Sequence, residues 1–145
     1  MNTLFDMTDE LDTVEYTASS IEVKEGDLFQ LGRHRLLCGD CTIKENIDLL
    51  MNGKKADMVF TDPPYNVNYS SKNIFLNSID KGNYIQMEIK NDKMSDDCFY
   101  SFLLQVFNNM KNILNTYSSY YICCSGMFID IFIQALKKMS LSIQV

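Results

Sequence analysis

The sequence has little positive charge and no long apolar run. Its 13 lysines and arginines are outnumbered by 19 aspartates and glutamates, so the formal net charge is −6. A protein that binds nucleic acid by itself needs basic side chains against the phosphates, and this balance argues against such a protein. No apolar run approaches the length of a membrane span, and the acidic N-terminal residues lack the positive region of a signal peptide. We therefore expect a cytoplasmic protein without a membrane partner.

Residues that bind metals are also few. The sequence holds one histidine and five cysteines. Cys38 and Cys41 have the spacing of half a zinc site, but Cys98 stands alone and Cys123-Cys124 are adjacent, so a second half with matching spacing is missing. We expect reduced cysteines that pack as small hydrophobic side chains, and no metal.

The only two prolines are adjacent, within Asp62-Pro63-Pro64-Tyr65. This motif follows an apolar run at residues 56–61 that predicts a short buried parallel strand. Two consecutive prolines make the chain leave the strand as a stiff turn whose carbonyl oxygens have no neighbouring donor. Asp62 then lies at the carboxyl end of the strand, where open α/β sheets bind their ligands, and Tyr65 adds a flat ring.

These groups suit a planar ligand that carries an amino group. The Asp62 carboxylate and the Pro63 carbonyl can each accept one N–H of an amine conjugated to a ring, which draws the lone pair out of resonance. Tyr65 can stack on the ring. The alternative interpretation is a rigid strand-to-loop turn with a capping aspartate.

The first half of the sequence predicts a strand pair followed by a helix. Short strands at residues 28–31 and 35–38 flank a tight turn at Gly32-Arg33. A capping-box pattern from Thr42 to Glu45 then predicts a helix that begins at Ile43 and ends at Asn52-Gly53. We expect this helix to bury Ile43, Ile47 and Leu50.

The second half predicts a loop and then further helices and strands. Residues 66–93 are polar and rich in Asn, Ser and Lys, which is typical of a long mobile loop with a function. Ser95 is a favourable N-cap for a helix whose apolar stripe runs from Phe99 to Leu114. Beyond this helix we expect a central strand, an amphipathic helix and the start of another strand, at residues 120–124, 127–139 and 141–145.

The motif Asp62-Pro63-Pro64-Tyr65 after a strand resembles the catalytic motif of amino-group DNA methyltransferases. The stretch from Glu25 to Cys41 resembles the lead-in of many phage and bacterial adenine methylases, and so does the spacing from Gly39-Asp40 to Asp62. The resemblance covers residues 21–145 and indicates the class in which the catalytic region comes first. An aspartate in the first position of the motif goes with adenine N6, whereas a serine is commoner for cytosine N4.

The resemblance implies an α/β fold, namely a partial Rossmann-like methyltransferase domain with an incomplete doubly wound sheet, at residues 21–145 behind a disordered acidic leader at 1–20. It also implies S-adenosyl-L-methionine as cofactor, double-stranded DNA as substrate and a role in restriction-modification. In this class a target-recognition region and a Phe-x-Gly-x-Gly cofactor loop follow, but none of the six glycines here lies two positions from another. We therefore expect a truncated chain that is inactive alone and needs a complementing C-terminal polypeptide.

The resemblance also assigns roles to individual residues. Asp62 and Pro63 would hold the amine of an adenine flipped out of the duplex, and Tyr65 would stack on that base. Asp40 matches a position near the adenine of the cofactor, although it serves equally well as a cap for the following helix. The expected catalytic residues are Asp62, Pro63, Pro64 and Tyr65; the cofactor-binding residues are Asp40, Cys41, Asp62 and Pro63; the substrate loop holds Asn66, Asn68 and Tyr69.

Two other functions remain open at this point. A non-catalytic remnant or binding module would keep the pocket at the strand end without any turnover. Related motifs also methylate amino groups of RNA or of a glutamine side chain in proteins. Methyl transfer to DNA, to RNA, to protein or to none of them separates these functions.

Overall fold

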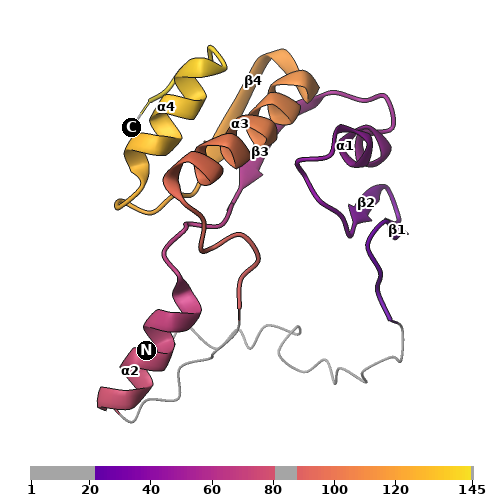
Figure 1. Cartoon of the computed structure of the whole chain (residues 1–145). Coiled ribbons are helices and arrows are strands. Elements are labelled where there is room, and N and C mark those ends of the chain that lie inside the picture. The colour runs from indigo at the N-terminus through magenta and orange to yellow at the C-terminus, as the bar shows by residue number, and fades with distance from the viewer. Residues whose placement is uncertain (1–21, 81–87, 145) are drawn as a thin grey trace, which may run out of the picture.

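The computed structural model describes residues 22–80 and 88–144, so the leader expected at 1–20 lies outside the described residues. Strands and helices are mixed along the described chain (Figure 1), and two of the strands pair in parallel, which confirms the predicted α/β class. In chain order the elements are β1 (Leu28–Leu31), β2 (His34–Leu37), α1 (Lys44–Met51), β3 (Ala56–Thr61), α2 (Tyr69–Asp80), α3 (Asp96–Ile113), β4 (Leu114–Ile122) and α4 (Ile129–Lys138).

Strands β3 and β4 pair in parallel, and this pair carries the motif. Parallel neighbours need a long crossover connection, which α2 and α3 provide between them. Val59 lies opposite Tyr120 and Thr61 lies opposite Ile122. Both strands therefore end at the same level, and the parallel strand predicted before the motif is confirmed.

The apolar core lies between α3, α4 and one face of the β3–β4 pair (Figure 1). Helix α3 begins as predicted, because the Ser95 side chain accepts a hydrogen bond from Cys98 N and acidic residues occupy the first turn. Its apolar stripe then packs against α4. The buried apolar residues are Phe99, Phe102, Leu103, Val106, Phe107, Met110, Phe132, Ala135 and Leu136.

The other face of the β3–β4 pair is open in the described structure. Met58 and Phe60 are 60% and 69% exposed, and Tyr121 beside them is 57% exposed. The prediction of a buried strand is therefore wrong for this face. The physical reason is that α3 and α4 cover only the side on which Val59 and Ile122 pack.

The N-terminal part confirms the strand pair and corrects the start of the helix. Strands β1 and β2 are antiparallel, with Leu31 opposite His34 across the predicted turn. The expected capping box is absent, because the Thr42 hydroxyl donates to the Asp40 carboxylate and Ile43 becomes an N-cap without a side-chain bond. Ile43 is 42% exposed, and α1 has no buried residue, so its expected burial is wrong.

The segment after the motif is the largest departure from the prediction. A continuous mobile loop was expected at residues 66–93, but residues 69–80 form helix α2, which projects away from α3 and α4 (Figure 1). Ile74, Phe75 and Ile79 on this helix are exposed and pack against no core, so α2 is not held by the apolar core that α3 and α4 share.

The C-terminal part differs in two boundaries. Strand β4 begins at Leu114, which was expected to end the preceding helix, and it extends well before residue 120. Residues 141–144 form no strand, although Leu141 and Ile143 pack against the core and Val145 lies outside the described residues. Within the described ranges, we find no helix with both the length and the apolar character to cross a membrane.

Replacing Phe107 by alanine should lower the free energy of unfolding by about 3–5 kcal/mol, because this ring is fully buried and packs against Phe132. Urea unfolding followed by circular dichroism measures the loss. Tyr117→Ala is the control, since Tyr117 is 98% exposed on β4 and its removal should change stability by no more than about 0.5 kcal/mol. Equal stabilities of the two variants would show that α3 and α4 do not enclose a core.

Candidate active site

The motif leaves β3 at the carboxyl end of the parallel pair. Cys123 N donates to Thr61 O at 2.9 Å, which carries the strand pairing up to the residue before Asp62. Pro63 is buried and Asp62 is exposed, so the turn is anchored by its proline while the carboxylate reaches the surface. The structure therefore places Asp62 where the sequence predicted it, at the end of a strand in an open sheet.

Tyr65 turns its hydroxyl back to Asp62. The phenol oxygen donates to Asp62 Oδ1 at 2.6 Å. This hydrogen bond, together with desolvation and the charge of Asp62, raises the pKa of Tyr65 to about 12. The hydroxyl is thus firmly protonated at neutral pH, and it occupies one acceptor of the carboxylate. Sequence reasoning expected the two residues to be neighbours but missed this contact between them.

Asn66 fastens the residue after the motif to the start of α3. The side chain is 7% exposed, its Nδ2 donates to Met94 O at 3.0 Å, and its Oδ1 accepts from Met94 N at 2.6 Å. Both halves of the amide are therefore used within the protein. This contact differs from the expected place of Asn66 in a free substrate loop.

Asp92 holds the next three residues. Its carboxylate is 4% exposed and accepts from Val67 N at 3.1 Å and from Tyr69 N at 2.6 Å. Its backbone oxygen accepts from Asn68 N at 2.8 Å. We call these contacts, together with those between Asn66 and Met94, the clamp.

The clamp requires an unusual backbone. Asn66, Asn68 and Asn91 have φ values of 59°, 52° and 68°, in the left-handed region. Asparagine tolerates this region better than other residues with a side chain. Surrounding contacts offset the conformational energy that a left-handed residue costs. The base of the segment at 66–93 is thus fixed rather than mobile, and Tyr69 becomes the first residue of α2. Nothing in the sequence marked Asp92, which is one of several charged and polar residues in this stretch.

Asp40 organises the turn before α1. Its Oδ1 accepts from Thr42 N at 2.9 Å and from the Thr42 hydroxyl at 2.7 Å, and its backbone oxygen accepts from Asn46. The hydrogen bonds from Thr42 lower the pKa of Asp40 below its ordinary value. Asp40 therefore holds the turn that precedes the helix, but its side chain does not cap α1, whose N-cap Ile43 has no side-chain hydrogen bond.

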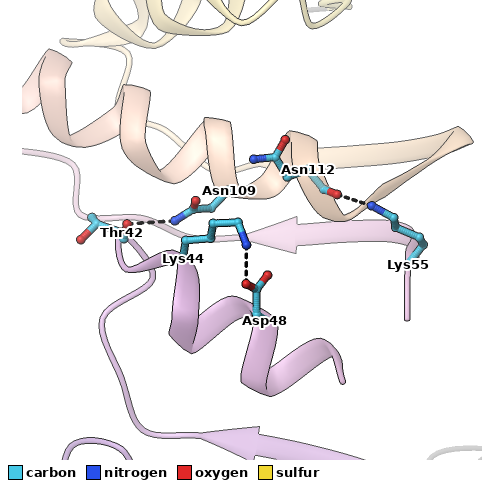
Figure 2. Close-up of polar contacts among 6 residues, drawn as sticks. All are labelled: Thr42, Lys44, Asp48, Lys55, Asn109 and Asn112. Atoms are coloured by element: carbon cyan, nitrogen blue, oxygen red, sulfur yellow. Dashed lines mark hydrogen bonds and ion pairs between the residues drawn. The ribbon is translucent and has the colours of Figure 1, made fainter. Parts of the chain in front are cut away.

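Asn109 connects this turn to α3, as Figure 2 shows for its bond to Thr42. Its Nδ2 donates to Cys41 O at 3.0 Å and to Thr42 O at 2.9 Å. The sequence signal that could have revealed this role is a polar residue, Asn109, in the middle of the apolar stripe of α3. Lys55, which directly precedes β3, donates to Asn112 O and so links this part of the chain to α3 as well (Figure 2).

The cysteines show no catalytic environment. Desolvation of the sulfur, followed by the nearby charge of Asp40, raises the pKa of the Cys41 thiol, so it stays protonated. Cys38, Cys41 and Cys98 are exposed, which differs from the packed positions expected, whereas Cys124 packs against the core. Among the described residues no group of three His, Cys, Asp or Glu side chains could hold a metal ion.

A hollow of about 400 Å³ lies between the Asp40 turn, the clamp and α3. It is lined by polar groups as well as by Met94 and Phe102, so it suits a ligand that carries hydroxyl or amino groups. Cys41 is not part of the lining, and neither is Asp62. The lining residues are Asp40, Thr42, Asn91, Met94, Asp97, Cys98, Ser101, Phe102 and Gln105.

A family model described as DNA methylase matches residues 56–145, from the first residue of β3 onwards. The match spans more than half of the chain and includes Asp62-Pro63-Pro64-Tyr65. The chain belongs to the amino-group DNA methyltransferase family. No match was found among curated proteins or among solved structures.

Family membership assigns the chain to DNA amino-group methylation as a class of activity. The family generally uses S-adenosylmethionine and acts on DNA. The matched residues 56–145 contain the clamp and α3, whereas Asp40 and the β1–β2 pair precede them.

Asp62→Asn should return the pKa of Tyr65 from about 12 towards its ordinary value of 10.0, because the neutral amide accepts a weaker hydrogen bond from the phenol and carries no charge. Carbon NMR of the hydroxyl-bearing ring atom follows this titration. Asp57→Asn is the matched control, since it removes a β3 carboxylate that bonds to Asn115 instead. Identical titration of Tyr65 in the parent and both variants would contradict the contact with Asp62.

Proposed function

We propose that the chain supplies the amine-binding part of an S-adenosylmethionine-dependent methyltransferase that modifies adenine N6 in double-stranded DNA. The observation that carries the proposal is the hydrogen bond from the Tyr65 hydroxyl to Asp62 Oδ1. An exposed carboxylate at the end of a parallel strand already accepts a neutral donor there, beside an aromatic ring. An aromatic amine has the same donor character and would replace the phenol.

The proposed chemistry starts with an adenine extruded from the duplex, because its amine cannot be reached inside the base stack. Asp62 and the carbonyl of Pro63 each accept one N–H, which withdraws the nitrogen lone pair from the ring and directs it outwards. Tyr65 leaves Asp62 and stacks on the base. Asp62 accepts the proton that the amine releases when it gains the methyl group. The acceleration comes from positioning of the reacting groups and not from a covalent intermediate with the protein.

The hollow beside Asp40 supports a cofactor site. S-adenosylmethionine, when bound, supplies an electrophilic methyl group. Asp40 uses Oδ1 for Thr42, and together with Asp97 and Gln105 it offers acceptors that suit ribose hydroxyls and an adenine amine. The protonated Cys41 thiol stands beside this hollow without lining it, so its proposed part is limited to shaping the turn.

The proposal includes a second polypeptide or further chain segment. The 145 residues contain no Gly-x-Gly pattern to seat the rest of the cofactor, and their net charge of −6 opposes binding to phosphate. A segment that carries the target-recognition region and the glycine loop would provide both. Aspartate in the first position of the motif is the feature that favours adenine N6 over cytosine N4.

Methyl transfer to duplex DNA should appear when the chain is mixed with such a segment from a family member, and Asp62→Asn should lower the rate by about a hundredfold or more. Radiolabelled S-adenosylmethionine measures the transfer, and nucleoside digestion identifies the product as N6-methyladenine. Asp57→Asn should leave the rate unchanged, because its carboxylate lies away from the motif and bonds to Asn115.

Two results would contradict the proposal. Transfer to RNA or to a glutamine side chain but not to DNA would assign the same site to another substrate. A folded chain without transfer in any combination would favour a binding module, in which the Tyr65–Asp62 contact closes the site permanently.

A further inference from the structure

Asp92 is a buried carboxylate without a cation. It is 4% exposed, and no described lysine, arginine or histidine forms an ion pair with it. A buried charge is costly unless hydrogen bonds satisfy it. Here the two carboxylate oxygens accept the backbone N–H groups of Val67 and Tyr69, and they do so at the N-terminal end of α2, where the helix dipole favours a negative charge.

Asn66 forms the other half of the clamp, and its side-chain donor and acceptor both have partners. Its amide pairs with both backbone groups of Met94, so donor and acceptor are both satisfied in a buried position. A carboxylate in its place would set one acceptor oxygen against another, the Met94 carbonyl. An alanine would leave the N–H and the carbonyl of Met94 without a partner. Only a side-chain amide fits this position.

The clamp begins at the residue that follows Tyr65. Residues 66–69 are therefore fixed to residues 92–94 across a separation of more than twenty positions in sequence. Asn66, Asn68 and Asn91 have left-handed backbone conformations, which asparagine tolerates and which these contacts stabilise. The clamp thus fixes the chain directly behind Tyr65, in addition to the proline turn and the hydrogen bond that hold Tyr65 close to Asp62.

We propose that Asp92 and Asn66 are positioning residues, which fix the backbone behind Tyr65 and so keep its ring close to Asp62, where it can stack on the target base. The catalytic consequence rests on the proposed function, whereas the positioning itself does not. A misplacement of about 1 Å can lower the rate of an enzyme by about a hundredfold. The clamp can therefore control the rate of methyl transfer although it touches no substrate.

Asp92→Asn and Asn66→Ala test this role in the full chain. In both variants the amide hydrogens of Val67 and Tyr69 should exchange with solvent at least about tenfold faster in NMR, while those of Leu103 and Phe107 in α3 keep their protection. The matched controls are Asp57→Asn and Asn112→Ala, at exposed positions outside the clamp and the motif. They should leave all four amides unchanged.

Two further measurements distinguish positioning from simple stability. The pKa of Tyr65 should fall from about 12 towards 10.0 in the clamp variants, because the phenol no longer stays against Asp62. In the complemented enzyme, kcat should fall about ten- to a hundredfold while KM for DNA changes little.

The outcomes separate this inference from the proposed function. Unchanged titration of Tyr65 in Asp92→Asn and Asn66→Ala would overturn the inference, and so would an unchanged kcat in an active complemented enzyme. An inactive parent enzyme would overturn the proposed function alone, since the titration of Tyr65 still decides whether the clamp positions it. Loss of protection in α3 as well would show that the two residues serve global stability, which also contradicts the inference.

Discussion

Parallel pairing of β3 with β4 is the constraint on which the site depends. Because Thr61 and Ile122 end at the same level, the chain must leave both strands at one edge, and Cys123 continues the pairing to the residue before Asp62. The core between α3 and α4 holds this pair from one side only. The position of the carboxylate therefore follows from strand register and from a single apolar layer, and the two prolines then direct the chain outwards.

The sequence predicted those parts whose signals are local. Two adjacent prolines after an apolar run located the turn, and Ser95 with an apolar stripe located α3. The clamp could not be found in this way, because Asn66 and Asp92 are distant in sequence and become partners only through the fold. Helix α2 was missed for a related reason: Ile74, Phe75 and Ile79 on it are exposed, so this helix takes no part in the apolar core by which α3 was recognised.

Asp40 illustrates how one side chain can satisfy two interpretations. Its hydrogen bonds with Thr42 explain its presence by local structure, yet the same turn lines a hollow that also reaches the clamp at Met94. The hollow and the motif thus share one structural support.

The central claim is that Asp62 and Tyr65 form a site for an aromatic amine. The most direct measurement is an NMR titration of the isotope-labelled full chain with adenosine and with N6,N6-dimethyladenosine, which has the same ring but no N–H to donate. The account predicts that adenosine shifts the amide signals of Asp62, Tyr65 and Asn66 and that the dimethyl compound does not. Equal shifts with both nucleosides, or shifts confined to other residues, would contradict it.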